Sequence, residues 1–112
     1  MTVHLDVLMA MAEKIVATAE AGRRPTSNDV TELTYPLQRG RQFTHQFEGY
    51  RERQSYGQFQ ALLEQYDAFV QAIDTARADP QRWEALRASL PAKAAALRAD
   101  AAQVRSALAR GD

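Results

Sequence analysis

Apolar positions along the chain recur every three or four residues, the spacing that places side chains on one face of an α-helix. Over residues 2–21 this spacing joins Leu5, Leu8 and Ile15. Gly22 follows, and glycine suits the left-handed backbone that often ends a helix. The pattern therefore predicts a first helix over residues 2–21.

The polar segment Pro25–Asp29 separates this helix from the next apolar run. Thr26 and Asp29 have the spacing of a capping box, and Ser27 is the alternative N-cap. A second helix is expected to begin there. Pro36 lacks a backbone N–H and disfavours helical angles in the residue before it, so we expect this helix to end just before Pro36 or to kink there.

Two apolar stripes follow, and they are half a turn out of phase with each other. Phe43, Phe47 and Tyr50 share one helical face, and a second stripe lies within residues 59–73. One straight helix would therefore point these stripes in opposite directions. We expect the chain to break or bend at residues 54–56, where Ser55 is suited to cap a new helix.

The last part of the chain contains two further helix starts. Asp79–Pro80 has the order of an N-cap followed by a first helical residue, and Pro91 suggests a second restart. The final helix is then predicted over residues 91–110. Its apolar stripe has heptad spacing and consists of Leu97, Ala101, Val104 and Leu108.

No segment alternates between apolar and polar residues with the period of two that indicates a strand. A length of 112 residues is typical of one domain. The sequence thus predicts a single all-α domain over residues 1–112, a small antiparallel bundle of four to five helices. The predicted core consists of Leu5, Leu8, Ile15, Leu33, Phe47, Phe59, Leu63, Tyr66, Val70 and Ile73.

Composition narrows the function without identifying it. The hydrophobic fraction of 46% includes many alanines, which bury little surface, so the C-terminal helix looks weakly anchored unless it packs on the domain or on another chain. Formal charge is zero, with a weakly acidic first third and a weakly basic last third that are able to pack together. This gradient is too mild to indicate binding to nucleic acid or to an anionic membrane.

Several classes of function find little support. The chain has no Cys, which excludes disulfides and thiol chemistry, and no stretch is apolar enough to cross a bilayer. We expect a cytoplasmic protein, and the excess of Arg over Lys suggests bacterial coding bias. Ser27, Ser55 and Ser89 each occupy a position where an N-cap is expected, and no Gly-rich phosphate loop is present, so no catalytic or cofactor-binding residue is assigned. His45 and Glu48 share a helix face, but the pair has no second copy, so no metal site is expected.

Residues 39–53 mix arginines with aromatic residues, and they are the first candidate contact surface. The candidate residues are Arg39, Arg41, Phe43, Phe47, Tyr50, Arg51 and Arg53. We interpret the aromatic residues as a core-facing stripe beneath a solvated face. If the segment does contact a partner, Arg and aromatic residues are typical of protein interfaces. Stacking on single-stranded nucleic acid is the alternative.

The C-terminal stripe is the second candidate surface, through Leu97, Val104 and Leu108. It is either the inner face of the last helix of a monomer or a docking helix for another chain. The sequence thus predicts a non-enzymatic protein-interaction module of adaptor, chaperone or inhibitor type. It would present a helix face or groove to a protein partner, with homodimerisation as one form of this. Exposure of the aromatic stripe would indicate a binding face.

Overall fold

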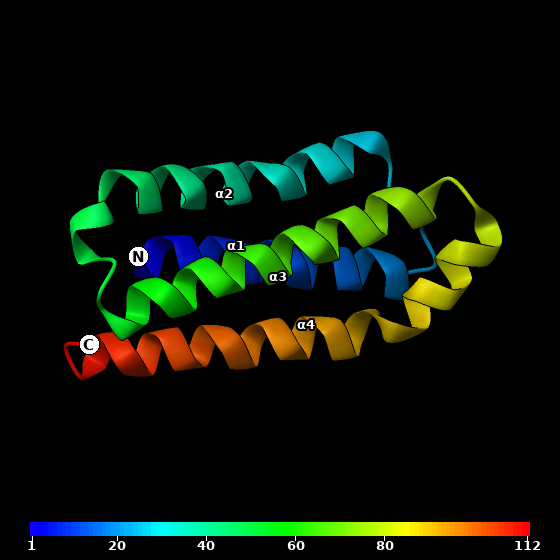
Figure 1. Cartoon of the computed structure of the whole chain (residues 1–112). Coiled ribbons are helices and arrows are strands. Elements are labelled where there is room, and N and C mark those ends of the chain that lie inside the picture. The colour runs from blue at the N-terminus through cyan, green and yellow to red at the C-terminus, as the bar shows by residue number, and fades with distance from the viewer.

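The computed structural model describes residues 1–112 and contains four α-helices and no strand (Figure 1). The helices are α1 (Thr2–Glu20), α2 (Ser27–Gln46), α3 (Gln54–Arg77) and α4 (Pro80–Ala109), and a 3-10 turn, η1 (Glu48–Tyr50), follows α2. The predicted small all-α bundle is confirmed, with four helices. None of them combines the length and the apolar character needed to cross a membrane.

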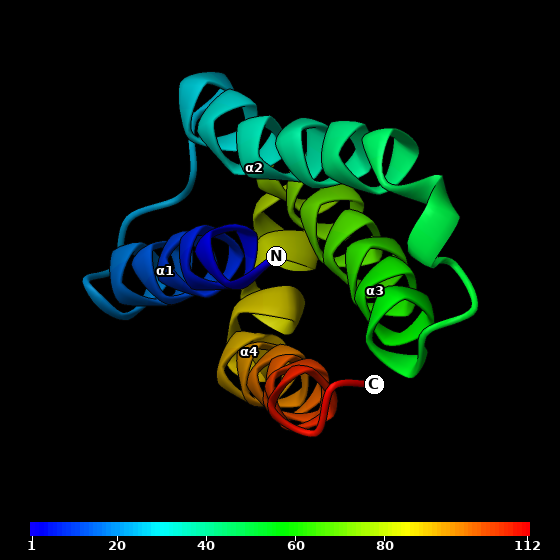
Figure 2. The same cartoon turned by 90° about the vertical axis from the view of Figure 1, so that its left-hand side faces the viewer.

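Successive helices run antiparallel, and each packs against both of its neighbours around a common core (Figure 2). The molecule measures 44 × 22 × 18 Å. Nine of the ten predicted core residues are buried, while Phe47 keeps 40% of its surface exposed. The prediction was wrong for Phe47 because α2 ends one residue before it, so the ring leaves the helical face that the spacing assigned to it.

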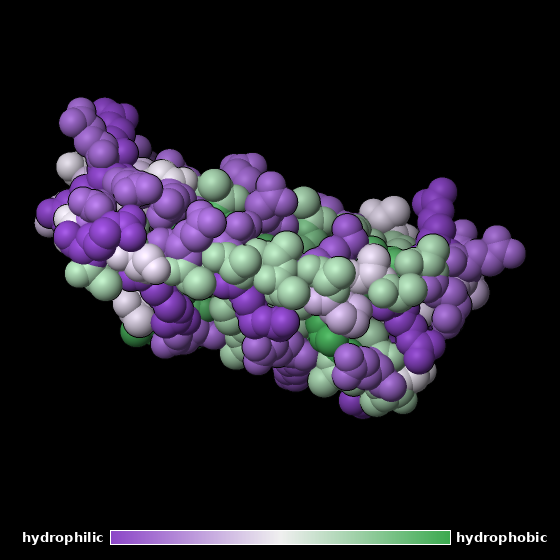
Figure 3. All heavy atoms as spheres, turned by 90° about the horizontal axis from the view of Figure 1, so that it is seen from below, coloured by the Kyte–Doolittle hydropathy of each residue, from purple (hydrophilic) through white to green (hydrophobic).

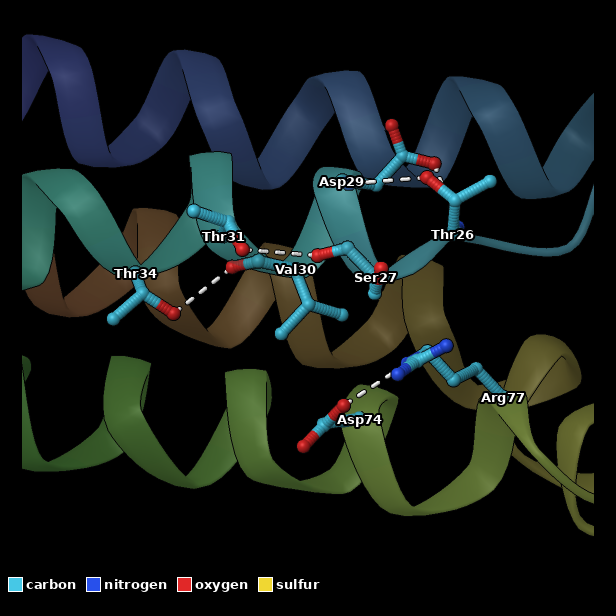
Figure 4. A network of polar contacts seen from close by, with 8 residues as sticks. All are labelled: Thr26, Ser27, Asp29, Val30, Thr31, Thr34, Asp74 and Arg77. Carbon is cyan, nitrogen blue, oxygen red and sulfur yellow. Dashed lines mark hydrogen bonds and ion pairs between the residues drawn. The ribbon is translucent and has the colours of Figure 1, made fainter.

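The start of α2 is fixed by the predicted capping box (Figure 4). The Asp29 backbone N–H donates to the Thr26 hydroxyl at 3.2 Å, and the Thr26 N–H donates to the Asp29 carboxylate at 2.9 Å. Two of the unpaired donors at the helix N-terminus are thereby satisfied. At the end of α1, Gly22 adopts the expected positive φ of 82°.

Pro36 neither ends α2 nor interrupts its assignment as one helix, contrary to the first sequence expectation. A proline removes one backbone donor and crowds the carbonyls of the preceding turn. The buried Tyr66 hydroxyl of α3 donates to the Leu33 carbonyl of that turn at 2.7 Å. Burial also raises the pKa of Tyr66 far above its ordinary value, so the hydroxyl keeps its proton. Packing against α3 thus holds the helix together around Pro36.

α4 is likewise one helix, and the predicted restart at Pro91 is wrong. The first turns of α4 (yellow in Figure 1) run at an angle to the remainder, as expected where a proline removes a hydrogen bond within a helix. Its start agrees with the sequence, because the Asp79 carboxylate accepts from the Gln81 backbone N–H at 2.9 Å. Trp83 and Leu90 of these turns are buried in the core.

The chain breaks between α2 and α3 earlier than residues 54–56, over the segment that contains η1. Ser55 is not a cap. It is buried in the first turn of α3, and its N–H donates to the carbonyl oxygen of Asp112 at 3.2 Å. The end of the chain therefore satisfies a backbone donor at the start of α3.

Two specific contacts join neighbouring helices, one between α2 and α3 and one between α1 and α4. α2 and α3 approach closely at Gly40, where a Cβ atom would lie 2.7 Å from a methyl carbon of Leu63. α1 and α4 are joined by an ion pair between Arg105 and Asp6, with a nitrogen–oxygen distance of 2.6 Å. This pair connects the acidic N-terminal part to the basic C-terminal part, as the charge distribution predicted.

Candidate interaction groove between α1 and α2

The exposed large apolar side chains of the molecule come from α1, from α2 and from the turn after α2. They are Val3, Val7, Tyr35, Phe47 and Tyr50, with exposed fractions of 71%, 43%, 58%, 40% and 48%. Three of them border a groove of about 370 Å³ between α1 and α2. Its lining residues are Val3, His4, Val7, Tyr35, Pro36, Arg39, Gln42, Phe43 and Gln46.

α1 presents this surface because it carries two apolar rows. Leu5 and Leu8 belong to the row that packs into the core and are fully buried. Val3 and Val7 lie one turn apart on a neighbouring face. His4 is partly buried on the same side of the helix and lines the groove. The core thus uses one face of α1 and leaves the second row uncovered.

A row of aromatic rings extends the groove toward η1. The ring centroid of His4 lies 4.9 Å from that of Phe43, and Phe43 lies 4.8 Å from Phe47. Tyr50 continues the row, with its centroid 6.1 Å from that of Phe47. Phe43 also meets the buried Phe59 edge-on at 6.0 Å, so the row is attached to the core at its inner end.

Two arginines lie over exposed tyrosine rings at this surface. The Arg39 guanidinium is 5.2 Å from the ring centroid of Tyr35, and the Arg53 guanidinium is 4.6 Å from that of Tyr50. Neither arginine has a carboxylate within ion-pairing distance. Each charge is therefore held by an aromatic face while its hydrogen-bond donors remain free of acidic partners.

Electrostatically the groove is positive and lacks an acid. No Asp or Glu is among its lining residues. Burial lowers the pKa of His4 below its ordinary value of 6.5, and the positive charges of the α-amino group and Arg39 lower it further. His4 is therefore neutral at pH 7, and Arg39 is the permanent cation of the groove.

Only part of the predicted arginine and aromatic set gathers here. Arg39 and Phe43 line the groove, and Phe47, Tyr50 and Arg53 adjoin it through the contacts given above. The remaining two arginines behave differently. Arg41 points toward α3, where it pairs with Asp67 at 3.0 Å, and Arg51 is exposed after η1 without an ion pair.

The C-terminal candidate stripe lies inside the molecule. Leu97 and Val104 expose 3% and 0% of their surfaces, and Leu108 packs partly buried against the core. These side chains are covered by the chain's own helices, so the structure accounts for the stripe within one monomer. Leu97 and Val104 therefore offer no surface to a second chain while the bundle is folded.

His45 and Glu48 are close but open to solvent. Their nearest nitrogen and oxygen atoms are 3.9 Å apart, and the His45 side chain is 85% exposed. No group of three or more His, Asp or Glu side chains is arranged to hold a metal ion.

Sequence reasoning missed the α1 side of the groove and Tyr35. Val3 and Val7 did carry a signal, because they form a second i, i+4 row beside the Leu5 row. Tyr35, the residue before Pro36, was considered only as the expected end or kink of the second helix. Its exposure on a continuous α2 depends on the helix passing through that proline, which the local sequence opposes.

Comparisons with known proteins add no relative. No protein-family model matches the chain, and neither a curated protein nor a solved structure matches it significantly. Functional inference for this chain therefore depends on the surface itself.

Proposed function

We propose that this protein is a non-enzymatic interaction module, of adaptor, chaperone or inhibitor type, that binds a helical segment of a protein partner in the α1–α2 groove. One observation carries the proposal: the exposed large apolar side chains of the chain gather at this groove and its aromatic extension. Apolar residues scattered singly on a surface need no explanation, whereas a contiguous patch with aromatic and Arg residues is typical of interaction sites.

The shape of the groove favours a helix as the occupant. Its walls are two antiparallel helices, and α2 contributes lining residues from Tyr35 to Gln46. At a rise of about 1.5 Å per residue this wall is about 16 Å long, or three helical turns. A partner helix lying along it would place apolar residues at intervals of one turn between Val3, Val7 and Tyr35, as in helix-in-groove recognition.

The outward face of α4 offers a weaker alternative surface. Figure 3, seen from the α4 side, shows a row of weakly hydrophobic atoms between hydrophilic side chains. Exposed alanines of α4 include Ala88, Ala92, Ala95, Ala99 and Ala102. Each presents a single methyl group, so this face buries less apolar surface per contact than the valine, tyrosine and phenylalanine side chains around the groove.

The nucleic-acid alternative has less support from the arrangement of its arginines. Binding single strands requires a cationic path lined by stacking rings. Arg41 is paired with Asp67 on the α3 side, and Glu48 and Glu52 are exposed beside Tyr50. Absence of a mobility shift with single- and double-stranded oligonucleotides at low salt would remove this alternative.

Site-specific photo-crosslinking in cells tests the proposal. A photoreactive amino acid is placed at Tyr35 or Val7 in the groove, with Ala95 and Ala99 on the outward face of α4 as matched exposed controls. We expect a discrete crosslinked protein from the groove positions and none from the control positions. Equal crosslinking from both faces, or none from the groove, would contradict the proposal. Because the proposed setting is the cytoplasm of a bacterial cell, the experiment uses bacterial expression.

A further inference from the structure

Resting on the proposed function, we infer that the groove binds an amphipathic helix of a different protein, one that carries carboxylates beside its apolar residues, and that it does not bind a second copy of this chain. The inference comes from the charges around the groove. These charges indicate an acidic partner, and Arg39 is the residue of this chain that would contact its carboxylates.

Arg39 is a cation without an acidic partner in the groove. Most arginines of the bundle form an ion pair with a carboxylate. Arg41, on the same helix as Arg39, is an example, because it lies 3.0 Å from the Asp67 carboxylate of α3. Arg39 has no such partner, although it lines the groove among Val3 and Tyr35. The carboxylates on the neighbouring surfaces of α1 and α2 are already engaged, since Asp6 pairs with Arg105 and Glu32 pairs with Lys14.

Arg39 is also held in position by an aromatic ring. Its guanidinium lies over the Tyr35 ring, one helical turn earlier in α2, which restricts the side chain before a partner arrives. A planar guanidinium with free N–H groups suits two-pronged hydrogen bonding to a carboxylate. An Asp or Glu on the rim of a bound helix would therefore meet a donor that is already oriented.

A second copy placed symmetrically against the groove is a poor occupant. A symmetric dimer would place this surface against itself. It would bring the Arg39 side chain of each copy into an interface whose lining contains no Asp or Glu. Cations would then be desolvated without counter-charges, which is costly. The apolar surface is consequently suited to a chain of complementary charge.

A displayed library of helical peptides tests the inference with a defined probe. Each peptide is about 14 residues long, enough for nearly four turns. Leucines are fixed one turn apart, and the flanking positions are random mixtures of Glu, Lys, Gln and Ser. The library is selected against the wild-type protein, Arg39→Gln, and Arg23→Gln, in which an exposed arginine without an ion pair is changed outside the groove.

We expect wild type and Arg23→Gln to enrich peptides with Glu at one flank, and Arg39→Gln to lose that preference. For an enriched peptide in solution, Arg39→Gln should weaken binding about five-fold or more, and added salt should weaken wild-type binding. Enrichment of neutral or basic peptides, or of none, would overturn the inference.

Sedimentation provides the arm that tests self-association. We expect wild type to sediment as a monomer. If wild type formed a dimer and Tyr35→Asp were monomeric, the inference would be overturned, because the groove would then bind a second copy of this chain. The crosslinking result at Tyr35 is read separately: a crosslinked partner together with a non-acidic peptide preference would remove this inference and leave the proposed function standing.

Discussion

The aromatic stripe that ends α2 and the apolar stripe of α4 look alike in the sequence and differ in the structure. Each places large apolar residues at helical spacing, Phe43, Phe47 and Tyr50 in one case and Leu97 and Val104 in the other. The α4 stripe is buried, whereas Phe47 and Tyr50 are 40% and 48% exposed. The stripe expected to be core lies largely at the surface, and the stripe considered for docking lies in the core.

The difference has a simple physical cause. α4 continues for 30 residues along α1 and α3, so its inner stripe is covered on both sides. α2 ends at Gln46, and the chain then turns through η1 before α3 begins. Periodicity determines which side chains share a face. Whether a neighbour covers that face depends on where each helix ends relative to the others.

Truncation of one residue from each stripe is the strongest test of this comparison. Leu97→Ala should lower the free energy of unfolding by about 2–4 kcal/mol, because it removes a buried side chain and leaves a cavity. Phe47→Ala should cost less than about 1 kcal/mol, since the ring is partly solvated already. It should also weaken crosslinking from Tyr35, because it shortens the aromatic row beside the groove. Urea denaturation followed by circular dichroism measures both. Similar losses of stability would show that the two stripes are equally buried.

Two tyrosines of α2 and α3 extend the comparison to hydrogen bonds. Tyr66→Phe removes the buried hydroxyl that donates to the Leu33 carbonyl, and it should cost about 1–2 kcal/mol. Tyr35→Phe alters an exposed ring in the groove and should leave stability nearly unchanged. The same denaturation experiment compares them. If Tyr66→Phe left the free energy of unfolding unchanged, the continuity of α2 through Pro36 would not depend on this hydrogen bond from α3.

Two helical glycines differ in how closely a neighbouring helix approaches them, since Gly40 lies against Leu63 and Gly57 faces open space. Gly57→Ala should stabilise the protein by up to about 1 kcal/mol, because helix propensity improves and nothing lies within 4 Å of the new Cβ. Gly40→Ala should gain less than this or destabilise, because Leu63 would have to move from its buried position. Equal gains at both sites would argue against close contact between α2 and α3.

The smallest expected effect concerns His4 and pH. Because burial lowers its pKa in the folded state, the unfolded chain binds the proton more readily. His4 therefore favours folding above its ordinary pKa of 6.5 and loses this contribution as the pH falls below it. Melting temperatures at about pH 7.5 and about pH 5.5 should differ less in His4→Gln than in wild type. His45→Gln, which changes an exposed residue outside the groove, should retain the wild-type difference.

The sequence predicts best what is determined by neighbouring residues. The Thr26–Asp29 box and the Asp79 cap depend on atoms within one turn, and both are found where the pattern places them. The buried rows of α1 and α3 are equally readable, because few arrangements other than a bundle would bury them. Leu5 and Ile73 are examples, and both are fully buried.

The effect of the prolines and the position of the groove were harder to predict from the sequence, because both depend on contacts between residues far apart in the chain. Pro36 and Pro91 each remove one hydrogen bond, and tertiary packing outweighs that loss in both helices. The groove was half predicted: Arg39 and Phe43 came from composition, whereas Val3 depends on the placement of α1 beside α2. No local rule contains that placement.

The first turns of α4, yellow in Figure 1, contain the single tryptophan of the chain and lie at the other end of the bundle from the start of α1, where the groove is found. Trp83 is 4% exposed, within the turns that fold over that end. Its emission should therefore report loss of the folded state through a change in colour and intensity. A ligand in the groove would leave that signal unchanged, so one optical reading can follow unfolding while a label on the peptide follows binding.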